Sequence, residues 1–314
     1  PEIVAPEVTA RVHQAMRDLD YQPNRHARAL SGIDTKTVGL LFFNDLWDLV
    51  LNPFWGMATS TVYDHLLAND LDCNLIALGK SITSSDRLST PERYREFLRT
   101  RNVDGFFVVG NVDPDQECHL ASSATPVVMW GKPAFADSPL TFVDTDHARG
   151  ATMAVDYLAD AGRTRIATIT GDLSVAAARD RFAGYQDALA RHHLEANSDL
   201  TAAGDFGRES GAVAMRDLLD RGVAIDAVFA ANDEMALGAL DVLDARGISV
   251  PEEIAIVGFD NVTLERPVQR RLTSIRHQYD VIGTMLVTAL VARMHGGYVA
   301  SSLVPPVLIA GDTA

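Results

Sequence analysis

The sequence predicts an α/β protein with two lobes, each built on a parallel sheet. Short apolar segments such as TVGLLFF (37–43) and RIATITG (165–171) alternate with longer segments of helical periodicity. Continuously apolar strands that alternate with helices are typical of parallel sheets covered on both faces. We count about ten such strands, which is too many for one compact open sheet and natural for two.

The composition indicates an acidic globular protein. The chain has 314 residues, 47% apolar and 22% charged, with a formal net charge of -15. This length allows two domains, each with its own core. No run of 18 apolar residues exists and the first residues hold no apolar core segment, so we expect no membrane span and no secretory signal. The two cysteines lack a paired spacing, so a cytoplasmic location is expected.

The N-terminal segment differs from the rest of the chain. Residues 6–20 predict one amphipathic helix, because apolar side chains recur at helical spacing. The segment DYQPNRHARALSG (20–32) predicts a second, very short helix that begins after Asn24. A helix this short is not stable alone in water. Arg25 and Arg28 make it locally basic in an acidic chain.

The later elements follow in order from the same two patterns. Apolar runs bounded by turn residues predict strands, and apolar residues three or four positions apart predict helices. The predicted strands are 37–43, 73–79, 104–110, 125–131, 165–171, 227–233, 253–260, 272–277 and 302–310. The predicted helices are 54–68, 91–101 with Thr90 as its cap, 147–161, 178–192, 208–221, 234–245 with Asp233 as its cap, and 281–295.

Several motifs of catalytic and cofactor sites are missing or broken. GKS (79–81) resembles part of a phosphate loop, but Asn74 stands where that loop needs glycine. Neither G-x-S-x-G, H-E-x-x-H nor G-x-G-x-x-G occurs, and the histidines and cysteines lack metal-ligand spacing. We therefore expect no enzyme, no cofactor and no metal.

Polar residues gather where predicted strands end. Ligands collect at the carboxyl ends of parallel strands, and carboxylates, amides and a guanidinium suit a neutral polyhydroxylated ligand. The candidates are Asn44, Asp45, Arg181, Asn232, Asp233 and Asp260. The aromatic residues near strand ends, which either stack on a sugar ring or belong to the core, are Trp47, Phe54, Trp55, Trp130, Phe206 and Tyr279.

Each candidate also has a purely structural interpretation. Asp233 is well placed to cap the following helix, and Asp260 could fix a turn with Asn261. Arg181 could be an ordinary surface arginine. The combination is therefore more informative than any single residue.

The chain resembles the LacI/GalR family of bacterial transcription regulators over nearly its whole length. The motifs that carry the resemblance, in the family's order, are RVHQAMRDLDYQPNRHARAL (11–30), RIATITGDLSVAAARDRFAGYQDAL (165–189), DAVFAANDEMALGAL (226–240), VPEEIAIVGFDN (250–261) and LTSIRHQYDVIG (272–283).

The resemblance implies a fold of two Rossmann-like lobes, as in type I periplasmic binding proteins. Residues 1–36 would be the remnant of a DNA-binding headpiece and its hinge helix, and 37–314 the effector-binding domain. Its N-lobe would comprise about 37–143 and 274–300, and its C-lobe about 146–272 and 302–314.

The resemblance also implies a homodimeric regulator, a repressor, that binds operator DNA and responds to a small effector, a saccharide. By motif position the implied effector contacts are Arg181, Phe206, Asn232, Asp260, His277 and Tyr279, and the strand-end residues Asn44, Asp45 and Phe54 complete the predicted effector site. The implied hinge residues at DNA are Asn24, Arg25, Ala27, Arg28 and Leu30, of which Leu30 would wedge into the minor groove.

The sequence departs from the family pattern in four places. The family's helix-turn-helix would precede Pro6 and is not in this sequence. Residues 46–51 (LWDLVL) are extra and should reshape the pocket mouth. Gly131 and Ala310 stand where the family usually has Asp and Arg.

A stand-alone sugar-binding protein of a transport system is the alternative interpretation of the function, and an enzyme that acts on sugars or nucleosides is a third.

Overall fold

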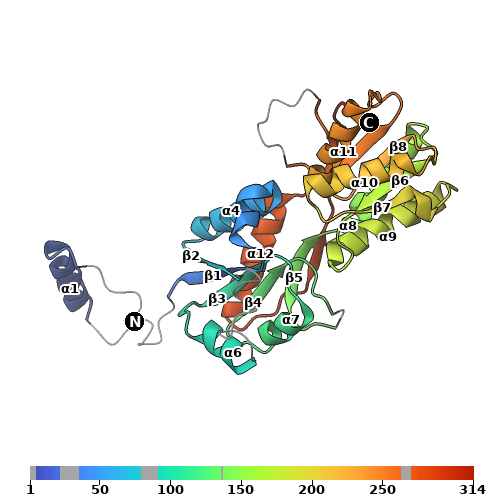
Figure 1. The fold of residues 1–314 in the computed structure, drawn as a ribbon. Helices are drawn as coiled ribbons and strands as arrows, with labels where there is room; N and C mark the ends of the chain where they lie inside the picture. Colours follow the sequence, from blue (N-terminus) through green and yellow to red (C-terminus); the bar gives the residue numbers. More distant parts are fainter. Residues whose placement is uncertain (1–4, 22–34, 79–90, 136, 263–269) are drawn as a thin grey trace.

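Two six-stranded sheets form the framework of the protein (Figure 1). The structure is a computed structural model that describes residues 5–21, 35–78, 91–135, 137–262 and 270–314. Each sheet occupies its own half of the molecule, which confirms the predicted two-lobed α/β fold. We call the halves the N-lobe and the C-lobe.

The N-lobe sheet has the strand order β11-β5-β4-β3-β1-β2, and its paired strands are parallel. Its strands are β1 (Thr37–Phe42), β2 (Asp72–Ala77), β3 (Gly105–Val109), β4 (Val127–Trp130), β5 (Thr141–Thr145) and β11 (Ser302–Val304). Its helices are α3 (Leu46–Leu51), α4 (Pro53–Ala68), α6 (Pro91–Arg99), α7 (Pro114–Ala121) and α12 (Tyr279–Met294). Although α12 comes late in the chain, it packs on this sheet (Figure 1).

The C-lobe sheet has the order β12-β10-β9-β8-β6-β7, and only the β10–β12 pair is antiparallel among the described strands. Its strands are β6 (Ile166–Thr170), β7 (Thr201–Ala203), β8 (Ala227–Ala230), β9 (Ala255–Asp260), β10 (Thr273–Arg276) and β12 (Val307–Ile309). Its helices are α8 (His147–Asp160), α9 (Ala176–Arg191), the 3-10 turn η1 (Ser198–Leu200), α10 (Arg208–Asp220) and α11 (Asp233–Ala245).

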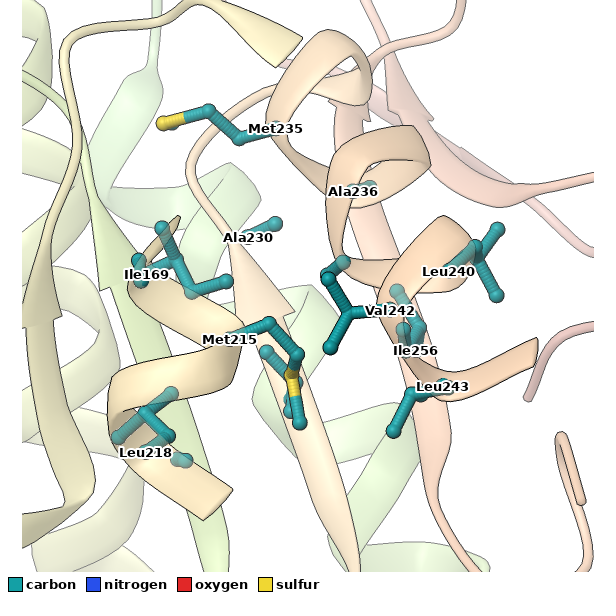
Figure 2. Close-up of a cluster of buried hydrophobic side chains, with 14 of the residues drawn as sticks. Ile169, Met215, Leu218, Ala230, Met235, Ala236, Leu240, Val242, Leu243 and Ile256 are labelled. Atoms are coloured by element: carbon teal, nitrogen blue, oxygen red, sulfur yellow. The ribbon is translucent and has the colours of Figure 1, made fainter. Parts of the chain in front are cut away.

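Each sheet has an apolar core on both faces, as its continuously apolar strands require. Figure 2 shows one of these cores, in which Met215 of α10 and Leu243 of α11 lie over Ile169 of β6 and Ile256 of β9. The N-terminal helix α1 (Pro6–Asp18) has no buried residue in the described part of the chain, so its apolar stripe contributes to neither core.

The chain passes between the lobes after Thr145, after Arg276 and between β11 and β12. The predicted single strand 302–310 is wrong, because Pro305 and Pro306 divide it into two strands that join different sheets. Likewise, 273–276 pairs in the C-lobe sheet, whereas the predicted boundary put most of it in the N-lobe. An apolar run predicts a strand but does not say which sheet the strand joins.

Several short elements were not predicted. The extra residues 46–51 form α3, and α7 begins at a capping box in which Asp113 and Gln116 bond each other's backbone N–H. The predicted cap Thr90 lies outside the described residues. No described helix is long and apolar enough to cross a membrane, and no described cluster of His, Cys, Asp or Glu is arranged to hold a metal ion.

The contact between α8 and α9 depends on Gly184. A Cβ added there would lie 2.1 Å from the backbone oxygen of Ala148. We expect Gly184→Ala to lower the free energy of unfolding by about 1–3 kcal/mol, measured by urea denaturation. Gly56→Ala is the matched control, because its nearest atom would be 3.6 Å away, and we expect it to be neutral or stabilising by up to about 1 kcal/mol. Equal midpoints for both variants would contradict this packing.

Candidate functional site at the crossing between the lobes

Three residues with unusual backbone conformations mark one region at the carboxyl ends of the C-lobe strands. Phe206, Asp260 and Asn261 have φ angles of 72°, 101° and 50°. Residues other than glycine rarely adopt a positive φ, and such backbone strain is often found at functional sites. Two of these residues, Phe206 and Asp260, are among the predicted effector contacts.

The Arg181 guanidinium is buried at the centre of this region, with 4% of the residue exposed. Its Nη2 lies 3.2 Å from Asp260 Oδ1, its Nε lies 3.3 Å from His147 Nδ1, and its Nη1 donates to the carbonyl of Ala231. Its Cζ stands 3.8 Å from the centroid of the Phe259 ring. Burial lowers the pKa of Arg181, while the carboxylates of Asp260 and Asp144 oppose that change.

His277 connects the Arg181–Asp260 pair to the first crossing. Its Nε2 lies 3.0 Å from Asp260 Oδ1 and its Nδ1 lies 2.6 Å from Thr145 Oγ1. Burial lowers the pKa of His277, and the hydrogen bond to Asp260 only partly offsets this. A neutral His277 donates from Nε2 to Asp260 and accepts the Thr145 hydroxyl at Nδ1.

Asp144 and His147 close these bonds into a ring. His147 Nε2 lies 3.2 Å from Asp144 Oδ1, which also accepts the N–H of Thr145 at 2.8 Å. We call the six residues Asp144, Thr145, His147, Arg181, Asp260 and His277 the buried ring. All are at most 4% exposed. The buried ring therefore ties the first and second chain crossings to α9 and β9.

Asn232 and Asp233 have roles opposite to those suggested by the capping prediction. Asn232, not Asp233, is the N-cap of α11: its Oδ1 accepts from Met235 N at 3.0 Å, and its Nδ2 donates to Phe206 O at 2.9 Å. The prediction placed the cap one residue too late. Asp233 instead accepts from Ser274 Oγ at 2.6 Å and from Val262 N at 3.0 Å. Burial, followed by the nearby Asp260, raises the pKa of Asp233 well above its ordinary value.

Aromatic rings of the N-lobe stand beside the buried ring. The centroids of Phe54 and Tyr279 lie 5.2 Å and 5.4 Å from that of His277. Trp130 lies 6.0 Å from Tyr279, and the Phe206 ring of the C-lobe lies 6.0 Å from Arg181 Cζ. The Tyr279 hydroxyl is buried and has no hydrogen-bond partner among the described residues. Burial raises its pKa, so it stays a protonated donor.

Two predicted contacts take no part in this arrangement. Asn44 accepts the N–H of Asn111 at 3.1 Å, and the exposed Asp45 begins α3 with its N–H 3.1 Å from Asp48 Oδ2. Asp45 thus stands at the N-terminus of the extra helix α3 and is not a member of the buried ring. The five predicted hinge residues, Asn24, Arg25, Ala27, Arg28 and Leu30, lie outside the described residues.

Asp144, Thr145 and His147 were not predicted as site residues. Asp144 and Thr145 end β5, a strand that the apolar pattern did not reveal because its sequence TFVDT is short and half polar, and His147 begins α8 just after it. The one available signal was that the expected boundary between the N-lobe and the C-lobe, about 143–146, falls at these residues.

Comparisons with known proteins agree with this architecture. Residues 155–314 match the family model of the periplasmic binding protein-like domain. The chain is 34% identical to the HTH-type transcriptional regulator CelR of Thermobifida fusca over 295 residues, 93% of this chain and 85% of the relative. It is 33% identical to the regulator GalR of Escherichia coli over 273 residues, 87% of this chain and 76% of the relative. Both relatives are named as transcription regulators.

Solved structures of transcription regulators also resemble this chain. The structure described as the transcriptional regulator CelR–cellobiose complex superposes with a TM-score of 0.80 at 30% identity, covering 100% of this chain and 92% of that one. The lac repressor dimer bound to operator and the anti-inducer ONPF gives 0.82 at 23% identity, covering 99% and 91%, and shows the likeness of fold. The chain therefore belongs to the LacI/GalR family of transcription regulators.

Proposed function

We propose that this protein is a dimeric repressor whose affinity for operator DNA is controlled by a neutral saccharide bound at the buried ring. The observation that carries the proposal is the set of unused polar groups there. Of the five N–H groups of Arg181, three have protein partners, which leaves two in the described part of the chain. Asp260 Oδ2 and the Tyr279 hydroxyl likewise have no partner among described residues. Sugar hydroxyls, which both donate and accept, match this set.

The charges of the site favour an unphosphorylated sugar. One guanidinium, Arg181, stands among the buried carboxyl groups of Asp144, Asp233 and Asp260. A phosphate would add negative charge where attraction and repulsion are weakly screened. The relative CelR was solved with cellobiose, and another relative, 30% identical over 296 residues, is the ribose operon repressor of Escherichia coli. Both names support a sugar.

The position of the buried ring suggests how a sugar would control DNA binding. Its members belong to the crossing segments and to both lobes, so a ligand held there acts on the relative position of the lobes. The predicted hinge precedes β1 of the N-lobe, and a lobe shift would change how two hinges meet on an operator. Because both ligands bias one two-state element, operator and sugar must change each other's affinity reciprocally. A repressor that binds an operator would act in the cytoplasm and would need no catalytic activity.

An exposed apolar face of the N-lobe supports a homodimer. Tyr63 and Leu67, one helical turn apart on α4, are 44% and 49% exposed, and Leu75 on the edge strand β2 is 47% exposed. Large exposed apolar side chains beside a free sheet edge favour a protein partner. We propose a second copy of this chain as that partner.

We expect Leu67→Glu to convert the dimer to a monomer in sedimentation velocity, because it buries a charge in the interface. Leu173→Glu, at a 43% exposed position of the C-lobe, is the matched control and should leave the dimer intact. Sedimentation of both variants as dimers would show that the contact lies elsewhere.

A thermal-shift panel tests the class of effector. Cellobiose, ribose and glucose should be compared with glucose 6-phosphate. A neutral sugar that binds should raise the free energy of unfolding by about 2.7 kcal/mol at a hundredfold excess over its Kd, and the phosphate should cause no shift. A shift with the phosphate alone would contradict the proposed charge preference.

Tyr279→Phe separates ligand binding from stability. Since the Tyr279 hydroxyl has no protein partner in the described part of the chain, its removal should leave the free energy of unfolding unchanged or raise it by at most about 3 kcal/mol. Affinity for the sugar should fall by about tenfold, measured by calorimetry.

Tyr185→Phe is the matched control for this prediction. The Tyr185 hydroxyl donates to Ile166 O at 2.8 Å, so its loss should cost about 1 kcal/mol of stability without a change in sugar affinity. If the Tyr279→Phe variant binds sugar as tightly as the wild type does, the Tyr279 hydroxyl is not part of the sugar-binding site.

A further inference from the structure

We propose that His147 is a positioning residue for the effector: its neutral imidazole orients the Arg181 guanidinium so that the unused N–H groups face the ligand. This inference rests on the proposed function, because it assumes that the ligand binds at Arg181. It assigns a role to a residue that lies outside the predicted set of contacts.

The bond to Arg181 determines which nitrogen of His147 carries the proton. Arg181 Nε can only donate, so His147 Nδ1, 3.3 Å away, must accept. The imidazole proton then sits on Nε2, which lies 3.2 Å from Asp144 Oδ1. Two hydrogen bonds in a row thus require one tautomer of a neutral ring.

The Nε2 side of the His147 ring is also fixed, because its acceptor Asp144 is itself held by hydrogen bonds. Asp144 accepts the N–H of Thr145 at 2.8 Å and the N–H of Lys132 at 3.1 Å. The Asp144 carboxylate thus accepts from three N–H groups, those of Thr145, Lys132 and His147 Nε2, and this last bond fixes the His147 ring.

His147 also shares an aromatic support with Arg181. The His147 ring centroid lies 5.6 Å from that of Phe259, and Arg181 Cζ lies 3.8 Å from the same ring. Nearly all of His147 is buried, with 4% exposed. The imidazole therefore has little freedom to move away from the guanidinium.

Three acceptors on different elements fix the plane of the Arg181 guanidinium. His147 Nδ1 comes from the start of α8, the Ala231 carbonyl from the end of β8, and Asp260 Oδ1 from the end of β9. Without His147, the guanidinium keeps acceptors only at its two terminal nitrogens, and its Nε–H is a buried donor without a partner. Such a donor is costly and favours rotation toward another acceptor.

The bonds continue from His147 to the other lobe and return to α9. Lys132 follows β4 of the N-lobe, its N–H binds Asp144, and its ammonium group pairs with Asp180, the neighbour of Arg181. The orientation of Arg181 is thus linked to the separation of the lobes through His147 and Asp144. A change in lobe position would reach the guanidinium through this path.

Conservative variants of His147 test the role in the full chain. Asn places an acceptor near the position of Nδ1, whereas Gln reaches toward Asp144 and leaves Arg181 Nε without an acceptor. In calorimetric titrations with cellobiose, His147→Asn should bind within about threefold of the wild type. His147→Gln and His147→Ala should lose about ten- to hundredfold in affinity.

His192→Asn is the matched control, because His192 also binds an aspartate, Asp156 at 2.8 Å, far from the ring. It should bind cellobiose as the wild type does. If all three His147 variants bind as the wild type does while Arg181→Lys loses affinity, the positioning role is overturned and the site stands.

Nitrogen NMR of the histidine rings in the sugar-free wild-type protein tests the same inference without any variant or ligand. We expect Nδ1 of His147 to be unprotonated and Nε2 to be protonated. A proton on Nδ1 overturns the inference by itself. Wild-type binding of cellobiose that is unchanged in Arg181→Lys, or no binding of any sugar in the panel, overturns the proposed function and the positioning role with it.

Discussion

The buried ion pair between Arg181 and Asp260 is the constraint on which the rest of the site depends. A charge in a protein interior must be paired and hydrogen-bonded, because desolvation otherwise costs several kcal/mol. The chain meets this requirement with a carbonyl at the end of β8, a carboxylate at the end of β9 and imidazoles from the first and second crossings. The same requirement accounts for the positive φ of Asp260, because this residue accepts hydrogen bonds from both Arg181 and His277.

We propose that ligand recognition explains this arrangement better than stability does. A well-packed apolar cluster would stabilise the protein at least as well as a buried ion pair. Within the described part of the chain, this pair instead leaves N–H groups of Arg181 and one carboxylate oxygen of Asp260 without a protein partner, at the point where the chain crosses between lobes. A polar network whose members lie on both lobes can translate a bound sugar into a lobe movement, which is what a regulator needs and a passive core does not.

Much of the fold could be predicted because it depends on local pattern, and the remainder depends on pairing. Apolar runs located most strands and helical spacing located most helices, but β11 and β12 read as one strand because pairing partners are not encoded locally. The family resemblance named Arg181, Asp260 and His277, which the structure brings together. It could not reveal the contact of His147 with Arg181, which forms only when the start of α8 meets α9, nor the short helix α3 that follows Asp45. Asn232 shows a further limit, since its strand-end position also makes it a helix cap.

A crystal structure of the protein grown with cellobiose would show whether the sugar binds at the buried ring. We expect sugar hydroxyls within hydrogen-bond distance of Arg181, Asp260 and Tyr279, with an aromatic ring against the sugar face and the His147–Arg181 bond intact. Sugar bound away from these residues, with the guanidinium still lacking a ligand, would contradict this expectation.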